Sequence, residues 1–284
     1  MPLSGIPLNI DEIYAPILEG VMLLWVALAI PFLIFVIVDI RSTPENPILK
    51  LGFVLVTADT GVIGAFLYVV GCREPLPGLH ERYVSARWRQ VLESTIHCVA
   101  GDGVGILAGA VISSVIHFSP FVDVAIEYSM GFLFGWAIFQ SLFMRDMAGG
   151  SYRRSLASTF IPELLSMNLL MTAMIPISTI SLANLPGGHN PLGVVFWFIF
   201  SMALLGGLGM AYPMNWWLVS RHLKHGMITV RPKTHDSESM INKHTDMHHP
   251  KESLPSRRII SIMASISILA LAAGITIAWF FGGL

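Results

Sequence analysis

Long apolar stretches alternate with short polar ones along most of the chain. Seven stretches are about 20 residues or longer, the length that an α-helix needs to cross a hydrocarbon core roughly 30 Å thick. They lie near 17–39, 49–71, 94–117, 122–144, 158–182, 192–219 and 259–281. Because lipid cannot satisfy backbone polar groups, each stretch is expected to be a helix. The pattern predicts an all-α, polytopic helical membrane protein, with a six-helix bundle followed by a seventh, C-terminal transmembrane helix.

One long polar stretch interrupts this pattern. Residues 226–257 lack apolar periodicity and contain Pro, Ser, Thr and Asn throughout, as well as His and Met. This composition is typical of a flexible loop. We expect a transmembrane body over 1–225, a polar cytoplasmic loop over 226–257, and an anchoring helix over 258–284.

Charge is scarce and unevenly distributed. Hydrophobic residues make up 54% of the chain and charged residues only 12%, against about 25% charged in soluble domains. With seven spans, 15 of the 17 Lys and Arg fall on one side, and only Arg41 and Lys50 on the other. The positive-inside rule then places the protein in the cell membrane with its N-terminus in the cytoplasm and its C-terminus outside. The lipid bilayer is the expected partner; we find no nucleic-acid-binding motif.

The third apolar stretch begins with polar side chains that could bind a metal. In "STIHCVAGDGVGI", Cys98 and Asp102 are four residues apart and share a helix face, while His97 is offset by about 100°. An ionisable group in a span is costly and normally faces a partner, a cavity or a pathway. Asp102 could instead pair with a cytoplasmic Arg. Asp59 and Glu127 are also intramembrane carboxylates, either cation sites or helix-to-helix hydrogen-bonding groups.

The fifth stretch, "FIPELLSMNLLMTAMIP", carries a stripe of sulfur. Glu163, Met167, Met171 and Met174 follow at helical spacing and lie on one face. Thioether and thiolate sulfur favour Cu(I), so copper is the expected ion if a metal binds there. Methionine is also an ordinary filler of apolar cores, and for this stripe taken alone packing is the favoured explanation.

Further methionines and histidines lie at the cytoplasmic end of the fourth span, in and just after the sixth span, and in the polar loop. Such clusters suit weak, exchangeable binding of copper or zinc, although they lack the fixed spacing of a structural zinc site. They are Met144, Met147, Met210, Met214, His222, His225, His235, Met240, His244, Met247, His248 and His249.

Small residues recur at four-residue spacing in two neighbouring spans. Gly101, Gly105 and Gly109 form one ridge, and Gly131 and Gly135 form the other. Ridges of this kind let helix backbones approach closely in lipid. We therefore interpret these glycines as packing residues.

Four long motifs resemble a known family. "STIHCVAGDGVGI", "EYSMGFLFGWAIFQSLFMRDMAGGSY", "FIPELLSMNLLMTAMIPI" and "AYPMNWWLVSRHLKHGM" are similar to a prokaryotic family of multi-pass membrane proteins known only as a domain of unknown function, from about 48 to 230. The matching positions are His97, Cys98, Asp102, Glu163, Met167, Asn168, Met171, Met174 and Asn215. Gly103 and Val104 depart from the Ala-Thr usual there. The resemblance implies a fold and brings no established site residue.

Three functions fit these observations. The first is handling or transport of a soft transition metal such as copper, with His97, Cys98, Asp102, Glu163, Met167, Met171 and Met174 as ligands or charge partners. It requires the methionine stripe to face the bundle interior. The second is a non-catalytic subunit or assembly factor that binds partner subunits of a membrane complex. The third, a membrane-embedded redox or lipid-modifying enzyme, has the least support, namely Cys98 and scattered histidines. His97 and Cys98 point to different sides of their helix and do not form a nucleophile–base pair.

Overall fold

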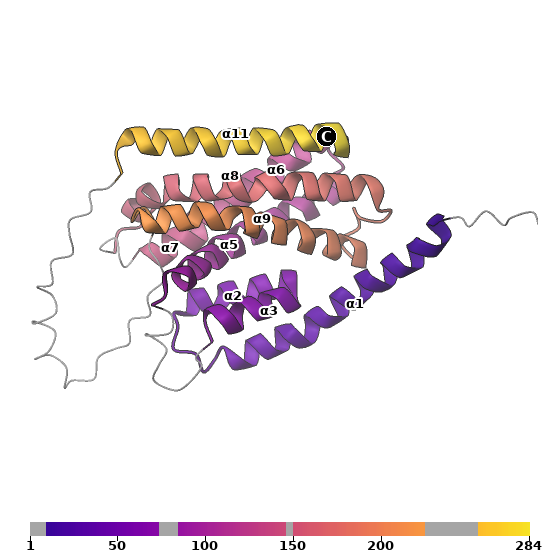
Figure 1. Cartoon of the computed structure of the whole chain (residues 1–284), viewed down its shortest axis with the longest axis horizontal. Helices are drawn as coiled ribbons and strands as arrows, with labels where there is room; N and C mark the ends of the chain where they lie inside the picture. The colour runs from indigo at the N-terminus through magenta and orange to yellow at the C-terminus, as the bar shows by residue number, and fades with distance from the viewer. Residues whose placement is uncertain (1–9, 74–84, 146–149, 225–254) are drawn as a thin grey trace, which may run out of the picture.

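The computed structural model describes residues 10–73, 85–145, 150–224 and 255–284. Within these ranges the secondary structure is helical, which confirms the all-α, polytopic prediction (Figure 1). The helices are α1 (Ile10–Asp39), α2 (Pro47–Thr60), α3 (Val62–Gly71), α5 (Arg87–Ile116), α6 (Pro120–Leu133), the π-helical segment η1 (Phe134–Gln140), α7 (Ser141–Met144), α8 (Tyr152–Asn184), α9 (Val194–Ser220) and α11 (Arg257–Gly282). In the described residues, six helical stretches are long and apolar enough to cross a membrane: α1, α5, α6 to α7, α8, α9 and α11.

The apolar stretch at 49–71 differs from the single span predicted for it. The chain reverses at Gly61, whose φ of 57° is accessible to glycine at little cost, and α3 returns alongside α2 (Figure 1). The rings of Phe53 and Tyr68 are 5.7 Å apart, and a Cβ on Gly64 would lie 2.6 Å from Thr57 Cα. With 14 and 10 residues, the two helices are about 21 and 15 Å long. The stretch is therefore a hairpin that enters and leaves at one end of the bundle.

Contacts at the base of this hairpin fix which helix ends lie together. Arg73, just after α3, pairs with Asp39 at the end of α1 at 2.9 Å, and Arg89 in the first turn of α5 donates to the Val70 carbonyl at 3.1 Å. Because the later spans alternate in direction, all Lys and Arg of the described ranges lie at this end. They are Arg41, Lys50, Arg73, Arg87, Arg89, Arg145, Arg153, Arg154, Arg221, Lys224, Arg257 and Arg258.

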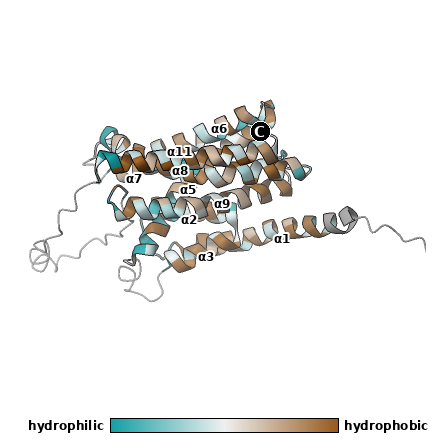
Figure 2. Ribbon diagram, turned by 45° about the horizontal axis from the view of Figure 1, so that its top comes forward, coloured by the Kyte–Doolittle hydropathy of each residue, from teal (hydrophilic) through white to brown (hydrophobic). Residues whose placement is uncertain are grey.

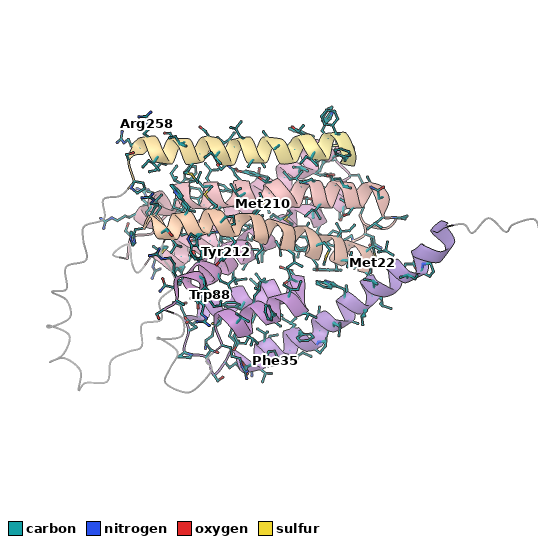
Figure 3. The ribbon with its side chains drawn as sticks, viewed as in Figure 1. Met22, Phe35, Trp88, Met210, Tyr212 and Arg258 are labelled. Atoms are coloured by element: carbon teal, nitrogen blue, oxygen red, sulfur yellow. The ribbon has the colours of Figure 1, made fainter. Side chains whose placement is uncertain are left out.

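The two ends of the bundle differ in polarity accordingly. Figure 2 shows hydrophilic residues gathered near α7 and at the base of α2, while the helices are largely hydrophobic along their length. In Figure 3, Trp88 at the start of α5 and Arg258 at the start of α11 lie toward this same end. We call it the basic end.

Helix α5 is central to the bundle. Its predicted glycine ridge is confirmed: a Cβ on Gly101 would lie 2.8 Å from the Phe139 side chain, one on Gly105 would lie 2.7 Å from Gly131 Cα, and one on Gly109 would lie 2.9 Å from the Glu127 backbone. Half of the membrane-crossing part of α5 is buried, against 11% for α1 and for α11. Side chains on α5 are therefore shielded from lipid much more than those on the outer helices.

Helix α11 packs along α8 rather than standing apart from the body. Asn168 donates to Ser267 at 3.1 Å, and a Cβ on Gly274 would overlap the Thr172 carbonyl. Side by side and parallel, the two helices cover a face of the bundle (Figure 1).

Candidate functional site

A thiol and two carboxylates meet inside the bundle, between α5 and α8. Cys98 Sγ lies 3.2 Å from Glu163 Oε2 and 3.7 Å from Asp102 Oδ2. All three side chains are fully buried, and one donor atom from each lies within 4.8 Å of the others. We call this group the Cys98 cluster. Its spacing is compatible with one metal ion bound between three donors.

A glycine on η1 makes room for this cluster. A Cβ on Gly135 would lie 2.6 Å from Glu163 Oε1 and closer still to Asp102 Oδ1. The π-helical segment therefore brings bare backbone against both carboxylates. Such segments are rare and frequently occur at functional sites.

A lysine completes the site from beyond the end of α9. Lys224 Nζ is 3.7 Å from Glu163 Oε2 and donates to Asn215 Oδ1 at 2.9 Å. Asn215 in turn donates to Ser166 Oγ at 2.9 Å, and that hydroxyl lies 3.2 Å from Cys98 Sγ. Burial by itself lowers the pKa of Lys224, but the neighbouring Cys98 and Glu163 hold the pKa above its ordinary value. The Cys98 cluster thus has a cationic side chain beside it, inside the bundle.

Of the seven predicted ligands, the structure brings Cys98, Asp102 and Glu163 together. His97 is buried but lies on a different face, as its helical offset indicated. Its Nε2 is 3.3 Å from the Phe139 carbonyl, and its ring packs on Phe143.

The methionine stripe is buried, as the metal hypothesis requires. Met167, Met171 and Met174 are at most 3% exposed and lie among the apolar side chains of the main core. The methyl carbon of Met167 faces Gly131, so that a Cβ on this glycine would lie 2.7 Å away. The three thioethers extend from Glu163 along α8 into an apolar region.

The remaining predicted donors do not join this cluster. Met214 is buried in a separate apolar group, whereas Met210 is 38% exposed, and Figure 3 shows Met210 midway along α9. His222 lies exposed after α9 and Met144 is partly buried at the end of α7. The others lie outside the described residues: Met147, His225, His235, Met240, His244, Met247, His248 and His249.

A cavity of about 420 Å³ opens at the end of the bundle opposite the basic end. Its lining includes Ser113, His117, Asp123, Glu127 and His189. Ser113 Oγ and one oxygen of Asp123 are buried without a hydrogen-bond partner in the described part of the chain. The cavity therefore combines imidazole, carboxylate and hydroxyl groups, all of which can bind a cation.

Asp59, the other intramembrane carboxylate named from the sequence, lies neither in the Cys98 cluster nor in the lining of this cavity. It lines a separate cavity of about 180 Å³ together with Trp25 and Ser201, whose hydroxyl donates to the Asp59 carbonyl oxygen.

Several residues of the site were not identified from sequence. From the sequence, Lys224 is only one of the 15 basic residues on the cytoplasmic side, Gly135 is a packing residue, and nothing distinguishes Ser166. Asn215 appeared only among the family's matching positions. The one local signal is that Lys224 follows the end of the predicted span 192–219 by only five residues, close enough for its side chain to reach back into the bundle.

The site described above lies within a segment that matches the model of a known domain family. Residues 87–224 match the model of a domain of unknown function, DUF4396. The predicted resemblance to an uncharacterised domain family is thus confirmed, over a shorter range than 48–230. No curated protein and no solved structure matches the chain. The matched segment runs from the start of α5 to Lys224 and includes every residue of the Cys98 cluster.

Proposed function

We propose that this multi-pass membrane protein handles a divalent transition-metal ion, which binds to Cys98, Asp102 and Glu163. The observation that carries the proposal is the convergence of these three buried donors within 4.8 Å beside Lys224. Buried ionisable groups in a membrane span are costly and commonly mark ion pathways.

The donor set favours an ion of the Zn²⁺ class over the Cu(I) expected from sequence. One thiolate with two carboxylates suits a borderline divalent ion, whereas Cu(I) prefers sulfur donors. The methionines that suggested copper pack in the apolar core, and His97 hydrogen-bonds elsewhere.

Lys224 gives the site a means of release. Its ammonium occupies the region beside Glu163 that a metal ion would neutralise. An incoming divalent ion would displace this ammonium, and the returning ammonium would favour departure of the ion. The two cations therefore compete for the same carboxylate.

The cavity at the opposite end supports transfer across the membrane. A Cβ on Gly109 would touch the backbone of Glu127, which lines the cavity. Gly109 is seven residues from Asp102 on the same helix, or about 10 Å along its axis. A cation gathered in the cavity would have a short route to the cluster.

For orientation, we propose that the basic end is cytoplasmic and that both termini are outside. Because the hairpin does not cross the membrane, the described residues contain six spans. All of their Lys and Arg lie at one end of the bundle, and the positive-inside rule assigns that end to the cytoplasm. This orientation differs from the sequence prediction in the N-terminus, which was expected in the cytoplasm, and agrees with it in the C-terminus.

Labelling of intact cells with a membrane-impermeant maleimide tests the orientation. We expect Gly283→Cys to be labelled and Arg41→Cys to be protected until the cells are opened. The unmodified chain is the control, because Cys72 and Cys98 are buried. Labelling of both Arg41→Cys and Gly283→Cys in intact cells would favour the seven-span prediction.

Metal content tests the function. The purified full-length protein is equilibrated with Zn²⁺, Co²⁺ or Cu(I), desalted and measured by mass spectrometry, and zinc flux is then measured in liposomes. We expect Zn²⁺ to be retained, and Cys98→Ser to lose one equivalent and the flux.

His97→Phe is the matched control, since the ring lies between Phe139 and Phe143 and outside the cluster. We expect it to keep its zinc. If Cys98→Ser is folded and keeps every equivalent of zinc, the assigned ligands are wrong.

A further inference from the structure

The second cysteine of the chain also lies between two carboxylates. Donor atoms from Glu45, Cys72 and Glu93 all lie within 4.8 Å of one another. Cys72 and Glu93 are fully buried. Neither carboxylate oxygen of Glu93 has a hydrogen-bond partner in the described part of the chain. A fully buried carboxylate without such a partner is costly, and a bound cation would compensate that cost.

Three separate segments build this group, which we call the Cys72 cluster. Cys72 ends α3 and donates its backbone N–H to the Tyr68 carbonyl at 2.9 Å. The preceding Gly71 lies against α5, so that a Cβ there would be 2.9 Å from the Leu92 side chain, next to Glu93. Glu45 is positioned by a tight turn between α1 and α2, in which its N–H donates to the Thr43 carbonyl at 2.9 Å.

We propose that Glu45, Cys72 and Glu93 form a second binding site for a divalent transition-metal ion of the Zn²⁺ class. The site repeats the donor set of the Cys98 cluster, one thiol and two carboxylates, at other positions of the chain. Binding requires Cys72 as a thiolate and releases its proton. Water or a further protein group would complete the coordination of zinc.

The position of the site along α5 gives it a role. Glu93 precedes Cys98 by five residues, or about 7.5 Å along the helix axis, toward the basic end. Ser113, at the opposite cavity, is about 30 Å from Glu93 along the same axis, close to the thickness of the hydrocarbon core. The Cys72 cluster is then the last binding site before the basic end. Binding there is independent of the Cys98 cluster, whereas this role rests on the proposed function.

Metal stoichiometry in a four-way comparison tests the second site. The unmodified protein, Cys72→Ser, Cys98→Ser and the double variant are loaded with Zn²⁺ and measured by mass spectrometry. We expect about two, one, one and no equivalents, in that order.

X-ray absorption on zinc-loaded Cys98→Ser supplies a readout of the remaining site. We expect one sulfur ligand at about 2.3 Å with oxygen ligands at about 2.0–2.2 Å. A coordination shell without sulfur would overturn the proposal.

The second test introduces Glu93→Gln into the Cys98→Ser protein. This change keeps the size of the side chain at position 93 and leaves the Cys72 thiol in place. We expect its zinc affinity to fall by more than about 100-fold, beyond the loss caused by removing an outer hydrogen-bond partner of a ligand. Glu19→Gln, the same change at an exposed glutamate of α1, should have no effect.

The outcomes separate the two proposals. Loss of one equivalent in folded Cys72→Ser but none in Cys98→Ser would sustain the second site and reject the proposed function. Full zinc content in folded Cys72→Ser or folded Glu93→Gln would reject the second site whatever the Cys98 cluster does.

Discussion

The two thiol–carboxylate clusters have the same donor types but different hydrogen-bonding surroundings. In the Cys98 cluster, Lys224 lies 3.7 Å from Glu163, and Ser166 and Asn215 link the ammonium to the thiol through hydrogen bonds. In the Cys72 cluster, the Glu93 carboxylate has no hydrogen-bond partner in the described ranges.

The basic side chains near the Cys72 cluster make contacts with backbone carbonyls. Arg89 Nε donates to the Val70 carbonyl and Lys50 Nζ to the Arg41 carbonyl. The comparison shows that similar donors can differ in what an arriving metal ion must displace. At the Cys98 cluster the proposed ion would displace an internal ammonium, whereas at the Cys72 cluster it would lie against a carboxylate that has no hydrogen-bond partner in the described residues. The first arrangement favours exchange and the second favours retention.

The largest expected effect comes from removing the internal cation. Lys224→Met leaves Glu163 buried without its partner, and we expect a loss of about 3 kcal/mol in unfolding free energy. Because the competing ammonium is gone, zinc should stabilise this variant more than it stabilises the unmodified protein. Thermal unfolding in detergent, with and without Zn²⁺, measures both effects.

Two variants serve as controls for Lys224→Met. Lys224→Arg keeps the positive charge and should lose much less stability. Lys50→Met removes a half-buried lysine near the Cys72 cluster and should change the free energy of unfolding by less than about 1 kcal/mol. If Lys50→Met and Lys224→Met were equally destabilising, the contrast between the clusters would be lost.

Filling the space beside the Cys98 cluster has the next largest effect. The methyl group of Gly135→Ala would overlap both Asp102 and Glu163, so we expect a loss of about 2 kcal/mol together with loss of zinc from this cluster alone. Gly209→Ala is the matched control, because nothing lies within 4 Å of a Cβ there. Unfolding temperature and metal stoichiometry are the measurements, and a Gly135→Ala protein that melts and binds zinc normally contradicts the geometry.

Breaking the hydrogen-bond link that Ser166 makes between Cys98 and Asn215 should lower the free energy of unfolding by a smaller amount. Ser166→Ala removes the hydroxyl between Cys98 and Asn215, at an expected cost of about 1 kcal/mol. The Cys72 cluster should keep its zinc. Ser129→Ala removes an exposed hydroxyl that donates to a carbonyl of its own helix and should change the unfolding temperature less; the reverse order would contradict the role given to Ser166.

Sequence patterning predicts the spans well but fails at 49–71, for a physical reason. A hairpin buried in the bilayer needs the same apolar composition as a span, so hydropathy cannot separate them. The reversal depends on the positive φ of Gly61, and glycine is also frequent in straight transmembrane helices. The orientation inferred from charge changes with this one feature.

For the candidate site, too, some features can be predicted from the sequence and others cannot. The shared face of Cys98 and Asp102, and the different face of His97, follow from helical periodicity. The approach of Glu163 on α8 requires tertiary packing through Gly135, and Lys224 lies about 60 residues further along the chain from Glu163. The Cys72 cluster joins three segments through the hairpin, and no local pattern predicts such a contact.

The smallest expected change in stability distinguishes the clusters most directly. Glu93→Gln replaces a buried carboxylate that has no hydrogen-bond partner in the described residues with a neutral side chain of equal size. We expect the apo-protein to lose no stability, or to gain about 0.5 kcal/mol, because no partner is left unsatisfied and a potential buried charge is removed. Glu163→Gln, by contrast, should destabilise the apo-protein, since it removes the partner of Lys224. Unfolding curves of both variants without metal make the comparison. A greater loss in Glu93→Gln than in Glu163→Gln would mean that the Cys72 cluster, rather than the Cys98 cluster, contains the stabilising charge pair.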